Sequence, residues 1–184
     1  MKLFYYYSIL FYFVISCNSE ERMANTYRRQ TKDFLELASI SNAFYNQYSF
    51  KEIVIKYNSG INQIRFATIV EAPYKYFGCE VSPKDFSIIK VNYSDSLTKH
   101  EKEMCSRILT DSTLKYIMEK YMQLKIQAIN ISTEGVFFSL GSSVKSRNPE
   151  ISAGILISSD TTQKYLNAIK QLEPGIYLYE MVVE

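Results

Sequence analysis

Residues 31–57 read TKDFLELASISNAFYNQYSFKEIVIKY, and the spacing of their apolar side chains changes near residue 50. Up to Tyr48 the apolar positions recur every three or four residues with polar side chains between them, which is typical of an amphipathic helix. From Phe50 to Tyr57 the central residues are β-branched and indicate a strand. A helix that leads directly into a strand indicates a domain that contains both helices and strands, and the rest of the chain indicates how they are arranged.

Further strands and helices are predicted on the C-terminal side of this stretch. The turn signal at residues 58–60 precedes a second strand at Ile64–Val70, for which a helix over 61–71 is the alternative. The other expected elements are a strand at Phe86–Tyr93, a helical segment from Ser94 to about Lys125 broken at Thr110–Thr113, strands at 126–132, 136–140, 151–158 and 176–183, and a short helix from Thr161 to Gln171.

The order of these elements is αβββαβββαβ. Most of the strands are separated by short turns, which favours antiparallel pairing. We therefore expect a mainly antiparallel sheet of about six to seven strands with helices packed on one face.

The composition limits the function classes that the chain can belong to. The 184 residues carry 21 Lys and Arg against 19 Asp and Glu, a net charge of +2. Such a balance argues against a nucleic-acid-binding protein, which needs a clustered basic face, and against an acidic disordered chain. With four prolines and six glycines, long linkers are not expected.

The first sixteen residues have the layout of an export signal. Lys2 precedes about fourteen mostly apolar residues, and polar residues begin directly after Cys17. This run is short for a membrane-spanning helix, which needs about 20 apolar residues to cross a hydrocarbon core of ~30 Å. An ordinary signal peptide cut near Cys17 or Ser19 and an uncleaved anchor are the alternatives that the sequence leaves open.

The stretch Val14-Ile15-Ser16-Cys17 resembles the lipobox of bacterial lipoproteins. The resemblance implies that the signal is cut before Cys17 and that its thiol is lipid-modified. It also implies a lipid-anchored protein of the bacterial cell envelope, and Asn18 after the cysteine favours the outer membrane. On this interpretation residues 1–16 are the signal peptide, residues 17–30 a lipid-anchored tether, and residues 31–184 a single α+β domain.

An aromatic stretch is the best candidate contact site in the mature chain. Tyr74, Tyr76 and Phe77 follow Pro73 in an expected loop, and such side chains supply a large contact area at low entropic cost. The alternative is that Tyr76 or Phe77 fills the core at the end of a hairpin. The loop Lys145–Asn148 is a second candidate.

Cys79 and Cys105 are the two other cysteines of the chain. An exported protein meets an oxidising compartment, where the two thiols could form a disulfide. Two separate thiols are the alternative, because the distance between the two Cα atoms cannot be derived from the sequence.

No motif specifies a reaction, a metal or a cofactor. His100 is the single histidine, and the position four residues on, where a zinc-protease helix needs its second histidine, is Met104. Ser96 has a lysine three residues on, but the companion motifs of serine–lysine enzymes are absent and Ser96 fits a helix cap. We therefore expect no bound metal or cofactor, and the sequence leans against an enzyme without deciding the question.

These features favour a non-catalytic, membrane-anchored lipoprotein that binds another protein, either as an immunity protein or as an accessory subunit of an envelope assembly. A small hydrolase of cell-wall or glycan material and a sensor of a small ligand are the alternatives.

Overall fold

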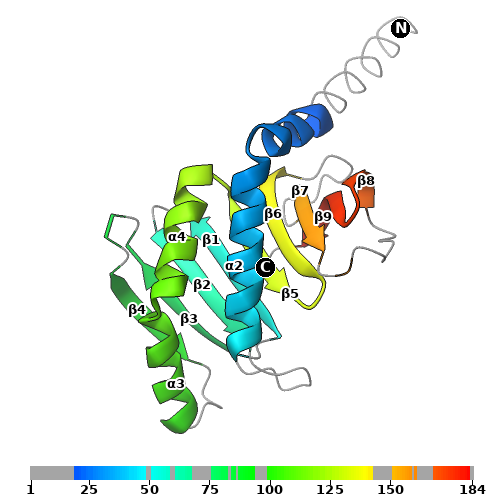
Figure 1. Cartoon of the computed structure of the whole chain (residues 1–184). Helices are drawn as coiled ribbons and strands as arrows, with labels where there is room; N and C mark the ends of the chain where they lie inside the picture. Colours follow the sequence, from blue (N-terminus) through cyan, green and yellow to red (C-terminus); the bar gives the residue numbers. More distant parts are fainter. Residues whose placement is uncertain are drawn as a thin grey trace, which may run out of the picture.

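The computed structural model describes residues 19–48, 51–58, 61–67, 76–82, 84–85, 87–93, 99–142, 151–158, 160 and 168–182. Residues 19–29 form a helix, called the N-terminal helix below. It is followed by α2 (Thr31–Tyr48), β1 (Glu52–Asn58), β2 (Ile61–Ala67), β3 (Tyr76–Val81), β4 (Ile88–Tyr93), α3 (Lys99–Leu109), α4 (Ser112–Leu124), β5 (Ala128–Ser132), β6 (Gly135–Ser142), β7 (Ile151–Ser158), β8 (Ala168–Glu173) and β9 (Ile176–Val182) (Figure 1).

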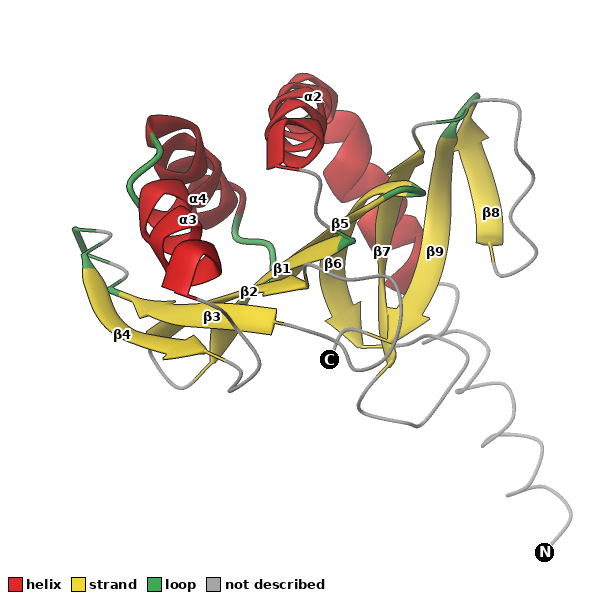
Figure 2. Cartoon of the chain, turned by 90° about the horizontal axis from the view of Figure 1, so that it is seen from below, coloured by secondary structure: helices red, strands yellow, loops and turns green. Residues whose placement is uncertain are grey.

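The described strands form one sheet in the order β4-β3-β2-β1-β5-β6-β7-β9-β8, and every neighbouring pair is antiparallel. Helices α2, α3 and α4 lie on one face, and the sheet curves around α2 (Figure 2). The predicted α+β class and the antiparallel sheet are therefore confirmed.

The strand count and the element order differ from the prediction, because nine strands are present among the described residues. One of the two unpredicted strands is β3, which we expected to be part of an aromatic loop. Gly78 lies in its interior, and glycine is a turn former that weakens a strand signal. The strand forms because it pairs with β2 on one side and with β4 on the other.

The other unpredicted strand is β8, whose residues 168–171 we expected to continue a helix; residues 161–167 of that helix lie outside the described part. Ile169 and Leu172 are extra residues in the pairing of β8 with β9, so each produces a β-bulge. The bulges break the alternation of a regular strand and leave apolar residues at the three-residue spacing of a helix. The prediction at 168–171 was therefore wrong.

The core between the helices and the sheet follows the predicted helical stripes. In α2 the buried residues are Phe34, Leu37, Ala38, Ser41, Phe44 and Tyr45, which all belong to the face expected from the sequence. In α4 the buried residues are Leu114, Ile117, Met118, Tyr121 and Leu124. They pack against alternate strand residues such as Phe138, Ile155 and Leu178, which are fully buried.

The opposite face of the sheet is also buried along β6, β7 and β9. Phe137, Leu156, Tyr177 and Tyr179 form a second apolar cluster there. They are the alternate neighbours of the residues that face the helices, so these strands are apolar on both sides. Near this cluster β6 and β7 come very close together: a Cβ added at Gly154 would lie 1.9 Å from the carbonyl oxygen of Phe138.

The N-terminal helix belongs to the folded domain. Met23, Ala24 and Tyr27 are buried, and the Met23 methyl group would lie 3.5 Å from a Cβ at Gly141 of β6. We expected residues 17–30 to be a polar tether that turns into a helix near residue 30. The structure places the start of the folded part at least as early as Met23.

Both ends of α4 are defined by single residues. The break between α3 and α4 falls at Thr110 and Asp111, as predicted, because Asp111 caps α4 with its carboxylate. At the other end Lys125 adopts the left-handed conformation, with φ 54° and ψ 35°, and its N–H donates to the Met122 carbonyl.

Candidate functional site

A groove opens between the helices and the end of the sheet that carries β4. It has a volume of about 390 Å³, which lies in the range of ligand-binding cavities. Its apolar lining comes from three strands and from the region around the α3–α4 junction. These residues are Ile64 of β2, Val81 of β3, Ile88 of β4, Leu109 of α3, and Leu114 and Met118 of α4.

Asp111 is a polar residue of the groove that is held by two side-chain hydrogen bonds from different parts of the chain. Its carboxylate accepts the Thr113 N–H at 2.7 Å and the Tyr48 hydroxyl at 2.5 Å. Burial acts to raise the pKa of Asp111, but these hydrogen bonds outweigh it and lower the pKa below its usual value. The bond to Asp111 also raises the pKa of Tyr48. Asp111 is therefore ionised at neutral pH, and it joins the end of α2 to the start of α4.

Asp85 contributes a second carboxylate, from the turn between β3 and β4. It accepts hydrogen bonds from the Ser87 hydroxyl at 2.8 Å and the Ser87 N–H at 3.2 Å. Hydrogen bonds from Ser82 and Ser87 lower the pKa of Asp85. The groove thus carries two fixed negative charges, and the exposed Lys115 supplies a positive one.

Exposed isoleucines extend the apolar surface beyond the groove. Among the described residues, the large hydrophobic side chains that are exposed to solvent are Leu35 (41%), Ile88 (41%) and Ile89 (56%). Ile88 and Ile89 lie next to each other on the edge strand β4, and Ile89 is the extra residue of a β-bulge opposite Glu80 and Val81. The sequence carries a signal for this bulge, because two adjacent isoleucines interrupt the alternation of the strand.

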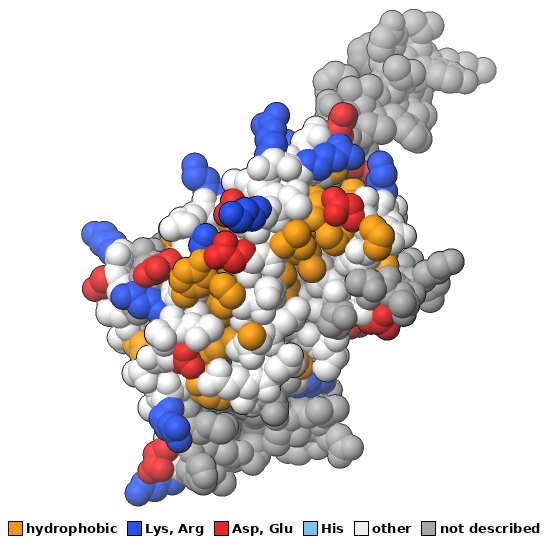
Figure 3. Space-filling model, viewed as in Figure 1, with side chains coloured by type: hydrophobic (Ala, Val, Ile, Leu, Met, Phe, Trp, Pro, Cys, Tyr) orange, Lys and Arg blue, Asp and Glu red, His pale blue; other side chains and the backbone are white. Residues whose placement is uncertain are grey.

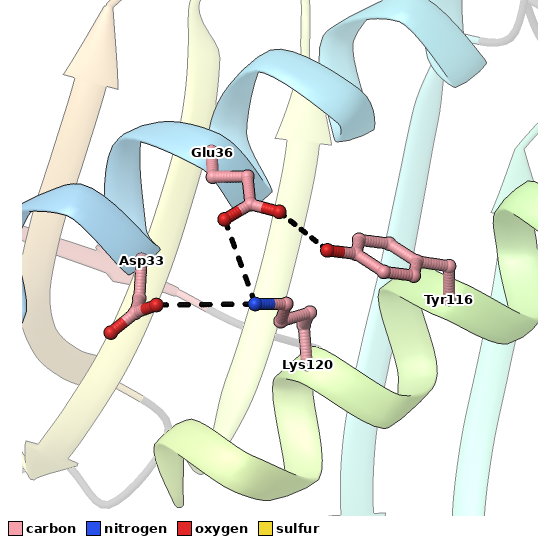
Figure 4. A network of polar contacts seen from close by, with 4 residues as sticks. All are labelled: Asp33, Glu36, Tyr116 and Lys120. Atoms are coloured by element: carbon pink, nitrogen blue, oxygen red, sulfur yellow. Dashed lines mark hydrogen bonds and ion pairs between the residues drawn. The ribbon is translucent and has the colours of Figure 1, made fainter.

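A separate polar network joins α2 to α4 on the outside of the helices (Figure 4). The Lys120 ammonium lies 3.6 Å from a Glu36 oxygen and 3.9 Å from an Asp33 oxygen, and the Tyr116 hydroxyl donates to Glu36. The Tyr116 hydrogen bond lowers the pKa of Glu36 and the same bond raises that of Tyr116. These pKa shifts favour the ionised form of Glu36 and the neutral form of Tyr116, which are their usual forms at neutral pH. We therefore interpret the network as a structural link between two helices.

The structure places the predicted contact residues only in part. Tyr74 lies outside the described residues, whereas Tyr76 and Phe77 are the first residues of β3, and Phe77 pairs with Phe66 and Tyr93. The side chains of Tyr76 and Phe77 lie outside the described part, as does the loop 145–148. Their role in contacts stays a prediction.

The two cysteines of the domain lie in β3 and α3. Cys79 is a free, buried thiol, and burial raises its pKa to about 12, so it is not a reactive thiolate at neutral pH. The side chain of Cys105, like that of His100, is not among the described ones. The structure thus shows Cys79 in its reduced form, and the disulfide with Cys105 stays a prediction for the oxidised protein.

The described residues contain no group of three or more side chains that could hold a metal ion. None of the helices in the described part combines the length and the apolar character that a membrane crossing requires.

Comparison of the chain with models of protein families, with curated proteins and with solved structures gives no match. The function must therefore be argued from the groove and from the N-terminal sequence.

The sequence did not predict the groove. Its apolar lining comes from residues as far apart in the chain as Ile64 and Met118, and no local pattern connects them. These residues meet because β1 pairs with β5, and that pairing brings two distant halves of the chain together.

Proposed function

We propose that this chain is a lipoprotein of the bacterial cell envelope, anchored in the outer membrane through a lipid on Cys17, and that it binds a partner protein without catalysing a reaction. The anchor rests on the apolar run before Cys17 and on the resemblance of residues 14–17 to a lipobox. An immunity protein and an accessory subunit of an envelope assembly are the two forms of this function that we favour.

The observation that carries the binding function is the groove together with the isoleucines beside it. Apolar side chains exposed beside a cavity offer a contact surface, because a partner that covers them removes apolar area from water and gains about 25 cal/mol per Å². Ile88 lines the groove and is also exposed to solvent, and the adjacent Ile89 is exposed on the same edge strand. The contact surface is therefore wider than the cavity, as is usual for a protein partner.

A small ligand is the second candidate, since a volume of about 390 Å³ is enough for a metabolite-sized molecule. Hydrolysis of glycans has less support at this site. It needs one carboxyl group with a raised pKa to act as the acid, whereas the pKa values of Asp85 and Asp111 are both lowered.

The anchor is tested by mass spectrometry of the protein purified from membranes of its own organism. We expect the mature chain to begin at Cys17 with acyl chains attached, and a Cys17→Ser variant to retain its signal and carry no lipid. A mature chain that begins elsewhere, or an unmodified Cys17, would show that this part of the proposal is wrong.

The binding function is tested by crosslinking the lipid-anchored chain in envelope extracts. Ile88→Ser and Ile89→Ser change the apolar edge of the groove, and Leu35→Ser is a matched control, because Leu35 is as exposed as Ile88 but lies on α2. We expect one stoichiometric partner that the Leu35 variant retains and both isoleucine variants lose. If correctly folded isoleucine variants capture the same partner equally well, the groove is not the binding site.

A toxin challenge distinguishes the two forms of the function. Cells with and without the protein are exposed to the toxin of a competitor, and equal survival would exclude the immunity protein and leave the accessory subunit.

A further inference from the structure

The N-terminal helix has a basic face that points away from the domain. Arg22 and Arg29 lie seven residues apart, which places them on the same side of a helix with 3.6 residues per turn. Met23 and Tyr27, on the other side, are buried against the domain. Arg22, Arg28 and Arg29 are all exposed, and Arg28 lies about 100° around the helix from Arg29, at the side of this face. In Figure 3, Lys and Arg side chains lie at this end of the molecule with acidic side chains among them.

These arginines have little internal compensation. Glu20 and Glu21 are the two acids of the same helix, but the described residues offer none of the three arginines a carboxylate within ion-pair distance. Arg28 donates one hydrogen bond, at 3.2 Å, to the side chain of Asn25. Guanidinium groups have five donors each, so most of their hydrogen-bonding capacity is directed to solvent.

The orientation of this face is fixed by packing. Met23 is only 4% exposed and lies close to Gly141 of β6, while Tyr27 is fully buried. The helix cannot rotate about its axis without removing these side chains from the core. The arginine face therefore has a constant direction relative to the domain.

The length of chain before the helix determines where this face lies in an anchored protein. The helix includes Ser19, two residues after Cys17. Two residues of extended chain span at most about 7 Å. A domain anchored at Cys17, as the proposed function requires, therefore holds the start of its basic helix within about 7 Å of the lipid attachment point.

We propose that Arg22, Arg28 and Arg29 bind the phosphate groups of anionic phospholipids in the membrane that holds the anchor. Guanidinium groups bind phosphate oxygens with paired hydrogen bonds, and basic side chains are attracted to anionic membrane surfaces. This inference rests on the proposed lipid anchor. Contact of the arginines with lipid phosphates, added to the attachment at Cys17, would hold the domain in one orientation on the membrane.

The orientation places the groove at a distance from the membrane. α2 has 18 residues, so it is about 27 Å long. It begins beside the N-terminal helix and ends at Tyr48, which donates its hydroxyl to Asp111 of the groove (Figure 1). The basic face and the groove therefore lie near opposite ends of α2, and the partner site stays accessible when the arginines contact lipid.

Hydrogen exchange of the lipid-modified chain in nanodiscs tests this proposal. The exchange of backbone amides in residues 19–30 is measured by mass spectrometry in discs of phosphatidylcholine alone and in discs with one third phosphatidylglycerol. We expect exchange to be at least threefold slower in the anionic discs. The difference should disappear in 0.5 M salt, where the screening length falls to roughly 4 Å.

Two triple variants separate a specific contact from general charge. Arg22→Gln, Arg28→Gln and Arg29→Gln together should abolish the slower exchange, whereas Lys84→Gln, Lys90→Gln and Lys99→Gln, which remove three exposed cations at the groove end, should retain it. Equal exchange in the two kinds of disc, or protection that survives in the arginine variant, would overturn the inference while the anchor stands. An unmodified Cys17 in the mass spectrum would overturn both.

Discussion

Ser41 lies on the buried side of α2, with its side chain fully enclosed and no hydrogen-bond partner for its hydroxyl. A buried hydroxyl without a partner loses its hydrogen bonds to water and gains nothing in exchange, which costs about 1–3 kcal/mol. We expect Ser41→Ala to raise the free energy of unfolding for this reason.

The matched control for this prediction is Ser39→Ala, because Ser39 is exposed on the same helix. Each substitution gains about 0.5 kcal/mol from the higher helix propensity of alanine. The difference between their changes in the free energy of unfolding therefore isolates the effect of burial. Urea unfolding should show Ser41→Ala more stable than Ser39→Ala by about 1 kcal/mol. A difference of zero would mean that the Ser41 hydroxyl has a partner, such as a buried water molecule.

Single residues were predictable where their chemistry is local. Asp111 was expected to interrupt the long helical segment because aspartate competes for backbone N–H groups, and it caps α4 in the structure. Its contact with Tyr48 could not be predicted, since 63 residues separate the two and the contact depends on how α2 and α4 pack.

At the scale of elements, the hydrogen bond between Tyr48 and Asp111 links α2 to α4. It makes the free energy of unfolding depend on pH. The pKa of Asp111 is lower in the folded state than in the unfolded state, where it is about 3.9. The ionised carboxylate therefore contributes fully to the free energy of unfolding above the unfolded-state pKa, and this contribution is lost as the pH falls through the folded-state pKa. Asp111→Ala should cost about 1–2 kcal/mol at pH 6, because the helix loses its cap.

Asp111→Asn keeps an N-cap acceptor but removes the charge, so it should be less harmful at pH 6 than Asp111→Ala. The stability gap between the unmodified chain and Asp111→Asn should narrow as the pH is lowered from 6 to 2.5, as measured by urea unfolding at each pH. A gap of constant size would show that the charge of Asp111 contributes nothing.

The pairing of β6 with β7 depends on the absence of a side chain at Gly154. A Cβ there would lie 1.9 Å from the Phe138 carbonyl oxygen, and the backbone of both residues belongs to the paired strands β6 and β7, so neither can move away independently. Gly154→Ala should cost more than 3 kcal/mol or prevent folding.

Gly141→Ala is the control for this prediction, because its new methyl group would meet only the end of the Met23 side chain at 3.5 Å, an ordinary contact. Soluble yield, circular dichroism and the urea midpoint of the two variants should therefore differ widely. Equal midpoints would mean that β6 and β7 are farther apart at this point.

The elements with regular periodicity were predicted from the sequence, and strands with a single bulge, such as β4, were predicted as well, whereas the doubly bulged β8 was not. α2, α4 and the hairpin of β5 and β6 follow clear spacings and are confirmed. β8 was assigned to a helix because the bulges at Ile169 and Leu172 remove the alternation that identifies a strand. A bulge depends on the partner strand, which the local sequence does not contain.

At the scale of the whole molecule, the N-terminal helix decides where the domain begins. Met23 is buried against the end of β6, so Met23→Ala should lower the free energy of unfolding by about 2–4 kcal/mol. Arg22→Ala, one residue away on the exposed face, should change it by less than about 0.5 kcal/mol. If both variants unfold at the same urea concentration, residues 19–29 do not pack on the domain in solution.

The groove forms only when distant elements of the whole molecule pack together, so the sequence did not reveal it. The groove needs the edge of the sheet and the α3–α4 junction to meet, and the sequence predicted neither β3 nor the order of the strands. The anchor that we propose at Cys17 rests on a short contiguous stretch, residues 14–17, so its prediction needs no knowledge of how distant parts of the chain pack.

Both edges of the sheet carry bulges, at Ile89 in β4 and at Ile169 and Leu172 in β8. For a chain held on a membrane, as we propose, neighbouring copies are confined to a thin layer and meet far more often than the same number of molecules in bulk solution. Straight free edges would then let sheets join from copy to copy into a growing film, because each edge exposes unpaired N–H and C=O groups. Irregular edges oppose such joining, because a bulge disturbs the regular row of N–H and C=O groups that a neighbouring strand would need.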